Sequence, residues 1–220
     1  MALEEEIDFI LQTMAKYMRK APKRSDVLSV FAGLRPLAAP QGEGKKTREI
    51  SRSHKIIVSK GQLFTMIGGK WTTFRKMAED MLQKIEETKS WDRKKSSTKN
   101  LKVHGYLPKV DMATPLYVYG SDKEKMMLLA QEKPELEGLI SASLELHKVQ
   151  VVWAVRHEMA RTVEDVLARR TRCLLLDARE SIRVAADVAQ LMAHEMGKDK
   201  QWEDDQVKNF VTVAKQYILN

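Results

Sequence analysis

A glycine pair between an apolar run and a helical pattern constrains this chain more than any other feature. Residues 64–67 are apolar or β-branched, Gly68 and Gly69 follow, and an amphipathic pattern begins after Thr72 and Thr73. This order is typical of a strand, a glycine turn and a helix with a threonine N-cap. The first N–H groups of a helix lack intrahelical partners and carry the positive end of the helix dipole. The stretch therefore favours a nearby anionic or electron-rich group, which glycines would allow to approach closely.

Lys70 directly follows the glycine pair, so a nucleotide-binding P-loop has to be considered. That motif needs a glycine five residues before the Gly-Lys pair and a serine or threonine straight after the lysine. Phe64 and Trp71 stand at those positions, which excludes a P-loop. The structural alternative for this stretch is an ordinary helix entry with a solvated lysine.

Composition restricts the class of protein without choosing a function. The 43% of hydrophobic residues can support a core, and no apolar run approaches the roughly 18 to 20 residues of a membrane span. The acidic start at residues 3–6 is unlike a signal peptide. The single cysteine, Cys173, excludes an internal disulfide and predicts a cytoplasmic setting. The net charge of +8 suits nucleic acid, an anionic membrane surface or small anionic ligands equally well.

Residues 1–88 are expected to combine helices and strands. Hydrophobic periodicity and turn residues predict helices at 4–20 and 72–87 and strands at 25–37, 53–58 and 62–67. The inner face of the second helix is expected to carry Phe74, Met77, Ala78, Met81, Leu82 and Ile85. Three or four short strands with a helix at each end leave the faces of the sheet without cover. This segment is therefore expected to be the tail of a larger domain.

Residues 89–101 are the most polar and least periodic part of the chain, which indicates a linker. Residues 102–220 change to a helical period and are expected to form an all-helical domain. Its helix signals are capping boxes at 121–124 and 162–165, Pro134 as a first helical residue, a helix rather than a strand at 149–155, and long patterns at 178–195 and 203–218. The fold class is α+β: a short, incomplete β-sheet segment with flanking helices, followed by an all-α C-terminal domain.

Three local strings of this chain carry a family resemblance through their order and spacing. They are residues 30–37 (Val-Phe-Ala-Gly-Leu-Arg-Pro-Leu), 50–55 (Ile-Ser-Arg-Ser-His-Lys) and 68–78, which opens Gly-Gly-Lys-Trp-Thr-Thr. Together they resemble the carboxy-terminal part of FAD-dependent glycerol-3-phosphate dehydrogenases. The helical half agrees through 119–120, 158–171 and 176–179, so the resemblance covers nearly the whole chain.

The resemblance implies a fold as well as a family. Residues 1–88 would be the remnant of a doubly wound FAD domain, and the glycine-rich dinucleotide motif would precede residue 1. Within the chain the nearest approach to that motif, residues 42–47, lacks the third glycine and a preceding strand. The 220 residues alone are therefore expected to hold no FAD and to be inactive.

The resemblance also implies an activity: oxidation of sn-glycerol 3-phosphate to dihydroxyacetone phosphate, with hydride passing to FAD and electrons then to a quinone or to oxygen. Arg35 and Arg52 are expected to bind the substrate, because a guanidinium offers phosphate a planar bidentate fork. Lys70 is the expected catalytic residue, since a positive charge there would stabilise electron density arriving on the flavin. The expected cofactor-binding residues are Gly68, Gly69, Lys70, Trp71 and Thr72.

Each of these assignments has a structural alternative. Arg35 could be a salt-bridge partner, Arg52 a solvated charge at the mouth of the hairpin, and Trp71 a packing residue. His54 lies beside Arg52, but a general base from outside these residues is the preferred interpretation. No histidine stands at metal-ligand spacing from a carboxylate, and no metal is expected.

A different class of function also has to be considered: a basic helical module that binds nucleic acid or a protein partner. Its contact would be Arg169-Arg170-Thr171-Arg172. Between apolar helix positions such a run is more often a structural or domain-contact patch, so no nucleic acid partner is expected. Peripheral contact with the inner face of the cell membrane stays open, as does a homodimer formed through exposed strand edges.

Overall fold

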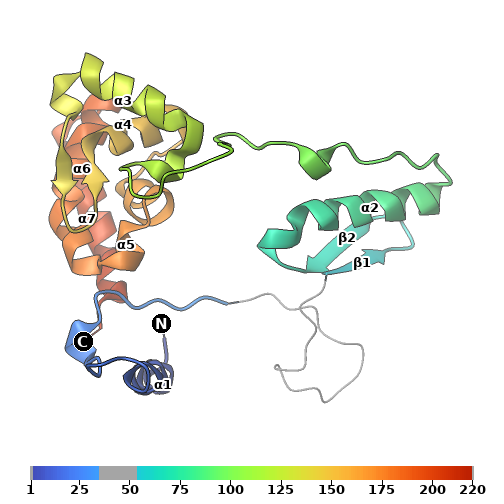
Figure 1. Ribbon diagram of the computed structural model, residues 1–220, viewed down its shortest axis with the longest axis horizontal. Coiled ribbons are helices and arrows are strands. Elements are labelled where there is room, and N and C mark those ends of the chain that lie inside the picture. Colours follow the sequence, from blue (N-terminus) through green and yellow to red (C-terminus); the bar gives the residue numbers. More distant parts are fainter. Residues whose placement is uncertain (1, 35–53, 220) are drawn as a thin grey trace. The chain divides into compact units, whose positions relative to one another are not determined.

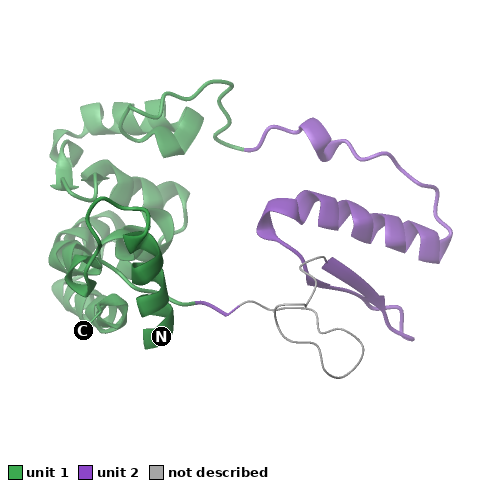
Figure 2. Cartoon of the chain, turned by 60° about the horizontal axis from the view of Figure 1, so that its bottom comes forward, with its two compact units in different colours: residues 1–32, 104–220 green, residues 33–103 purple. Residues whose placement is uncertain are grey.

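The computed structural model describes residues 2–34 and 54–219. The chain divides into two compact units (Figures 1 and 2). We call residues 1–32 together with 104–220 the helical unit, and residues 33–103 the hairpin unit.

The described regular elements are α-helices, short strands and short 3₁₀ or π turns. The α-helices are α1 (Glu4–Ala15), α2 (Phe74–Lys89), α3 (Lys123–Glu132), α4 (Lys148–His157), α5 (Cys173–Leu176), α6 (Ala178–Met196) and α7 (Lys200–Ala214). The strands are β1 (His54–Val58), β2 (Phe64–Gly68), β3 (Leu139–Ser141) and β4 (Leu146–His147). Short 3₁₀ turns lie at Arg24–Asp26, Trp71–Thr73, Thr98–Asn100, Tyr117–Asp122, Pro134–Leu136 and Lys215–Tyr217, and a π-helix spans Asp165–Arg170.

The hairpin unit consists of β1 and β2, paired antiparallel, with α2 packed along them (Figure 1). His54 pairs with Gly68 at the open end of the hairpin, and Val58 pairs with Phe64 beside the turn. The predicted strands and helix are confirmed within two residues. No residue between 54 and 103 is fully buried, so two strands and one helix do not enclose a core of their own.

The inner face predicted for α2 is only partly covered. Met77, Met81 and Ile85 are half-buried, whereas Phe74 is 59% exposed and Leu82 is 60% exposed. The apolar face of an amphipathic helix is at least about 100° wide, and a two-stranded hairpin covers only part of that width. The prediction that Phe74, Ala78 and Leu82 face inward is therefore wrong for the described unit.

The core of the helical unit lies between α4, α6 and α7. Val184, Val188 and Met192 of α6 recur at helical spacing and are fully buried, as is Phe210 of α7. The side chain of Asp177 caps α6 by accepting a hydrogen bond from the Glu180 N–H at 3.0 Å. The predicted helices at 149–155, 178–195 and 203–218 are confirmed, with the last one ending in a 3₁₀ turn.

A smaller core forms where α3 and the turn at Pro134–Leu136 pack on α4. Its buried members are Met126, Leu136, Val149, Val152 and Trp153. Pro134 is the first residue of its turn, as predicted. The helical unit thus encloses two apolar clusters, in contrast to the hairpin unit as far as residues 54–103 show.

The two predicted capping boxes have different outcomes. In the 162–165 box, the Thr162 hydroxyl accepts from the Asp165 N–H at 3.1 Å and the Asp165 carboxylate accepts from the Thr162 N–H at 3.0 Å. The box predicted at Ser121 is wrong, because α3 starts one residue later and no side chain caps it. The Asp122 carboxylate at that position instead accepts hydrogen bonds from His104 and Lys125.

Residues 25–34 form no strand, which corrects the prediction of a strand at 25–37 for its described part. The segment is hydrogen-bonded to the helical unit instead. Ser29 Oγ donates to the Leu174 carbonyl at 2.8 Å, the Val30 N–H donates to the Tyr217 carbonyl at 2.8 Å, and the Leu28 carbonyl accepts from the Ala178 N–H. The predicted first segment, 1–88, is therefore divided, and its first 32 residues group with the helices.

Helix α1 joins this arrangement through Arg24, whose guanidinium bridges Glu4 and Asp8. α1 ends at Ala15, before Pro22 and earlier than the predicted Lys20. Among the described residues, no helix combines the length and apolar character needed to cross a bilayer.

Candidate functional site

The glycine turn stands where the sequence predicted it, between the end of β2 and the start of α2. Gly68 has φ 76° and Gly69 has φ 88°, values that glycine adopts without strain. A Cβ on Gly69 would lie 2.6 Å from the Sδ and Cε atoms of Met77 and 3.2 Å from the Cβ of His54. The turn is therefore closely enclosed by α2 on one side and β1 on the other.

Lys70 follows the turn as an exposed residue with extended backbone, and α2 begins only after the 3₁₀ turn at Trp71–Thr73. Thr73 occupies the N-cap position of α2, as predicted, but its hydroxyl donates to the Lys70 carbonyl at 2.9 Å. No side chain caps the start of α2. The N–H groups of Thr73 and Phe74 donate to the carbonyls of Lys70 and Trp71 in the 3₁₀ turn, and the positive end of the helix dipole lies at this entry.

The aromatic residues after Lys70 lie on the surface of the unit. Trp71 is 89% exposed, and its ring centroid lies 6.0 Å from that of Phe74. Trp71 is therefore not a core residue of the hairpin unit. Thr72 is exposed as well, whereas Gly68 and Gly69 are half-buried.

Polar side chains behind the turn link β1 to α2. The Nε2 atom of His54 lies 3.0 Å from Oδ2 of Asp80, and the Lys76 ammonium donates to Oδ1 of Asp80 at 2.6 Å. The hydrogen bond from Lys76 is the largest influence that lowers the pKa of Asp80, and His54 adds to it. On the same helix Arg75 donates to Glu79 at 3.2 Å, while its Nη1 is buried with no hydrogen-bond partner among the described residues.

Sequence reasoning found the turn and Lys70 but missed Lys76, Asp80 and Arg75. The spacing of Lys76 and Asp80 is a signal for an intrahelical ion pair. Their link to His54 depends on the pairing of His54 with Gly68, which no local pattern shows. Arg35 and Arg52, the predicted substrate-binding arginines, lie outside the described residues.

The residues present fit the electron-rich edge of a flavin. Glycines bring the backbone within reach, an uncapped helix start supplies positive potential, and Lys70 adds a full positive charge at an exposed position. Gly68, Gly69, Lys70, Trp71 and Thr72 would hold the cofactor there.

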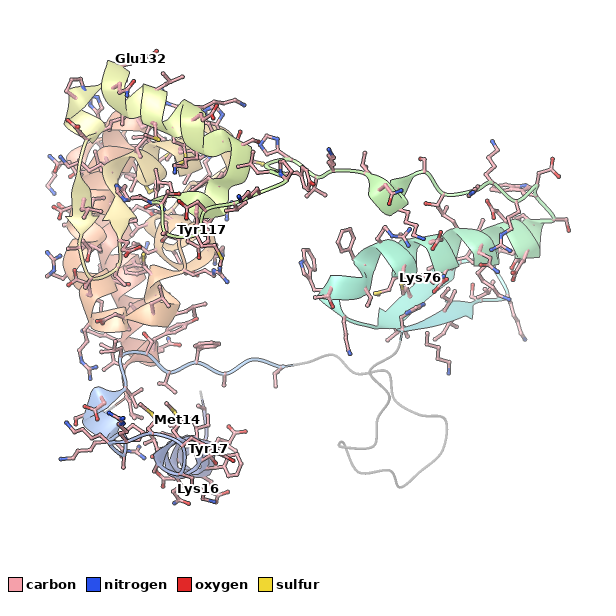
Figure 3. All side chains as sticks on the ribbon, viewed as in Figure 1. Met14, Lys16, Tyr17, Lys76, Tyr117 and Glu132 are labelled. Carbon is pink, nitrogen blue, oxygen red and sulfur yellow. The ribbon has the colours of Figure 1, made fainter. Side chains whose placement is uncertain are left out.

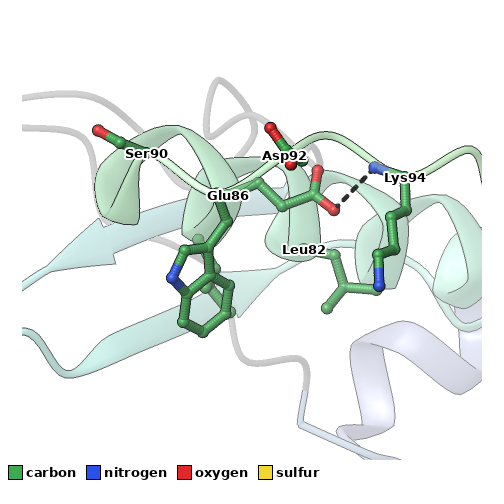
Figure 4. Close-up of a pocket in the computed structure, with 7 residues that line it drawn as sticks. Leu82, Glu86, Ser90, Asp92 and Lys94 are labelled. Atoms are coloured by element: carbon green, nitrogen blue, oxygen red, sulfur yellow. Dashed lines mark hydrogen bonds between the residues drawn. The ribbon is translucent and has the colours of Figure 1, made fainter.

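Two hollows in the described part of the structure lie away from this turn. One, of about 550 Å³, is found at the C-terminal end of α2, where the Lys94 N–H donates to Glu86 at 3.3 Å beside Trp91 (Figure 4). Another, of about 970 Å³, lies in the helical unit and is lined by residues that include Phe31, Leu116 and Arg172. Neither contains a residue of the stretch 68–72, whereas the second includes Arg172 from the arginine run.

The arginine run at 169–172 is largely occupied by contacts within the helical unit. Arg169 pairs with Asp165 at 2.9 Å and with Glu164, and Arg170 donates to the Glu158 carbonyl at 2.9 Å. Side chains held in this way are poorly placed to contact phosphates. This geometry weakens the alternative of a nucleic-acid-binding module. Within residues 2–34 and 54–219, no group of three or more His, Cys, Asp or Glu side chains could hold a metal ion.

The chain is thus an α+β protein in which a glycine turn and an exposed lysine precede α2 in the hairpin unit, and the rest of the described chain is mainly helical. The chain matches the family described as the C-terminal domain of alpha-glycerophosphate oxidase over residues 62–203. It belongs to this family, and the resemblance to the carboxy-terminal part of FAD-dependent glycerol-3-phosphate dehydrogenases is confirmed.

Curated relatives agree with this assignment. The chain is 30% identical to the mitochondrial glycerol-3-phosphate dehydrogenase SDP6 of Arabidopsis thaliana, over 98% of this chain and 38% of that protein. It is 28% identical to the mitochondrial glycerol-3-phosphate dehydrogenase of Saccharomyces cerevisiae, over 96% of this chain and 40% of that protein. It is 27% identical to the mitochondrial glycerol-3-phosphate dehydrogenase of Homo sapiens, over 98% of this chain and 32% of that protein. The chain thus spans about a third to two-fifths of the length of these relatives. Their mitochondrial names give no support to the predicted cytoplasmic setting.

Proposed function

We propose that this chain forms the end of the flavin site in an enzyme that oxidises sn-glycerol 3-phosphate to dihydroxyacetone phosphate. The observation that carries the proposal is the half-buried Gly68–Gly69 turn followed by the exposed Lys70 ahead of α2, whose start no side chain caps, in a chain of the glycerophosphate oxidase family. FAD would supply the hydride acceptor, and a quinone or oxygen would take the electrons afterwards.

Lys70 has the central role in this proposal. Its ammonium would stabilise the electron density that arrives on the flavin, and the N–H groups at the start of α2 would add their partial positive charge. Preorganised charge of this kind acts without reorganisation during the reaction, and loss of one such group typically costs about 10²- to 10³-fold in kcat.

Arg35 and Arg52 are proposed to hold the phosphate of the substrate. Hydrogen bonds to charged groups are worth about 1.5–3 kcal/mol each, so two arginines would provide useful affinity for a small phosphate ester. The general base is proposed to come from outside these 220 residues. Peripheral membrane contact and a homodimer stay predictions, as does the absence of FAD from the 220 residues on their own.

The test is the substitution Lys70→Ala in a protein of the family's full length that carries this sequence. We expect the rate of flavin bleaching by glycerol 3-phosphate in stopped-flow absorbance to fall by about 10²-fold or more. The reason is that the substitution removes the exposed positive charge that directly follows the glycine turn.

Lys60→Ala is the matched control, because Lys60 is an exposed lysine in the turn at the opposite end of the same hairpin. That variant should retain the parental rate within about twofold, as expected for a surface substitution. Normal flavin reduction in Lys70→Ala, or an equal loss in Lys60→Ala, would show that Lys70 does not have the assigned role.

A further inference from the structure

The strongest unexplained feature of the hairpin unit is the polar contact behind the glycine turn. His54 is the residue of β1 paired with Gly68, and its Cβ lies next to the space that a Cβ of Gly69 would need. Its ring nitrogen Nε2 reaches Asp80, on the second turn of α2, at 3.0 Å. The side chains of His54 and Asp80 are only 23% and 26% exposed, which favours an ordered contact. We call it the His54–Asp80 bridge.

Asp80 is the acceptor in this bridge. Lys76 occupies the other carboxylate oxygen at 2.6 Å, and the Lys76 hydrogen bond lowers the pKa of Asp80. An ionised carboxylate can only accept hydrogen bonds, so Nε2 of His54 carries the proton in the bridge. Figure 3 shows Lys76 on α2, the helix that also bears Asp80.

The hairpin and α2 are joined by a second side-chain contact at their far end. Within the described residues, Lys89 at the end of α2 donates to the Gln62 side chain in the hairpin turn. Both of these side chains belong to exposed residues. The remaining ion pairs of α2, such as Arg75–Glu79, stay within the helix. The His54–Asp80 bridge is thus placed at the end of the helix that carries the glycine turn, and the Lys89–Gln62 contact at the other.

We propose that the His54–Asp80 bridge is a positioning device for Lys70. By tying β1 to the second turn of α2, it holds Gly68 and Gly69 between them and so sets the direction in which Lys70 leaves the turn. This inference rests on the proposed function. His54 acts here through Lys70 and does not contact the reacting atoms. A displacement of about 1 Å in a catalytic group is enough to cost as much as about 10²-fold in rate.

The experiment uses the family-length protein carrying this sequence, with flavin reduction by glycerol 3-phosphate measured over a range of substrate concentrations. His54→Leu and Asp80→Ala should lower the limiting rate about tenfold and change the half-saturating substrate concentration by less than about threefold. His54→Gln retains an N–H donor that can reach Asp80. It should recover most of the parental rate.

The matched control is Lys89→Met, which removes the far contact and keeps the aliphatic stem. A merely structural role for both contacts predicts similar losses in rate for Lys89→Met and His54→Leu. The positioning role predicts that Lys89→Met reduces its flavin at the parental rate within about twofold. Equal losses in the two variants, or a parental rate in His54→Leu, would overturn the proposal.

Hydrogen–deuterium exchange on the same proteins tests the bridge without turnover. Peptides covering residues 68–74 should exchange several-fold faster in His54→Leu than in the parent, because loss of the bridge frees the turn to open locally. In Lys89→Met, the faster exchange should be confined to peptides around residues 60–64 and 86–90. Unchanged exchange at 68–74 in His54→Leu would refute the bridge, whether or not the parent protein oxidises glycerol 3-phosphate. A parent protein that does not oxidise glycerol 3-phosphate would refute the proposed function but not the bridge.

Discussion

The helical unit and the hairpin unit have similarly amphipathic helices but differ in what those helices bury. In the helical unit, α6 places Val184, Val188 and Met192 against α4 and α7, and all three are fully buried. In the described part of the hairpin unit, α2 meets only two strands, and no residue is fully buried. An apolar face thus becomes a core only where enough neighbouring elements cover it, since stabilisation scales with the apolar area removed from water.

This difference in burial means that the two units are stabilised in different ways. A unit with two apolar clusters can hold its own structure, whereas a hairpin and a helix without a core derive little stability from their own burial. The candidate site nevertheless lies on the hairpin unit, around Gly68, Gly69 and Lys70. Its local order then depends on specific contacts such as the His54–Asp80 bridge more than on packing.

The largest expected effect is the loss of stability when a buried aromatic residue of the helical unit is replaced by alanine, compared with an exposed one of the hairpin unit. Phe210 in α7 is 1% exposed, whereas Phe74 in α2 is 59% exposed. Phe210→Ala should lower the free energy of unfolding of the helical unit by about 3–5 kcal/mol, and Phe74→Ala should lower it by less than about 0.5 kcal/mol. Urea unfolding, with labelling of the buried thiol of Cys173 as the probe of the helical unit, measures both. Equal costs would contradict the contrast in burial.

A glycine in each unit provides the next comparison. A Cβ on Gly120 would lie 1.8 Å from the Gly105 carbonyl oxygen, which is backbone, whereas a Cβ on Gly69 would meet the flexible end of Met77. Gly120→Ala should therefore cost about 2–4 kcal/mol of stability, and Gly69→Ala about 1–2 kcal/mol. Thermal unfolding of the helical unit measures the first, and hydrogen exchange of residues 68–74 measures the second.

Gly138→Ala is the control for backbone strain alone, because Gly138 has φ 90° with open space around it. It should cost about 1 kcal/mol. If Gly120→Ala were no worse than Gly138→Ala, the close approach of the Gly105 carbonyl would not restrict this position.

The smallest expected effect is the loss of folding stability at acidic pH that is due to Glu180. In the helical unit, hydrogen bonds from Arg183 and then from Ser141 lower the pKa of Glu180 from 4.5 to about 2. A depressed folded-state pKa stabilises the fold above the unfolded value, and this contribution is lost as the pH falls from about 5 towards about 2. Because Arg183 is largely exposed, we expect on the order of 1 kcal/mol.

Urea midpoints at pH 7 and pH 3 measure this contribution. Glu180→Gln should lose stability at pH 7 and show a shallower dependence on pH than the parent. Glu132→Gln, an exposed carboxylate at the end of α3, should keep the parental dependence. An unchanged dependence in Glu180→Gln would show that the contacts with Arg183 and Ser141 do not stabilise the fold.

Local patterns predicted most of the elements and the position of the glycine turn. The hairpin at 54–68, the glycine turn, α2, α4, α6 and α7 all follow from periodicity and turn residues within a window of a few residues. The strand predicted at 25–37 is wrong for residues 25–34, because β-branched and aromatic residues suit any extended segment. Its hydrogen-bond partners, the carbonyls of Leu174 and Tyr217, lie far away in the sequence.

By itself, the sequence determined the order of strand, glycine turn and helix, the helical second part, and the family to which the chain belongs, since each is encoded in short motifs or in their order. Only the tertiary structure decided that residues 2–32 group with the helices, which α2 side chains are covered, and that His54 meets Asp80. Those outcomes depend on which distant segments come into contact, and a local period carries no information about contacts between elements.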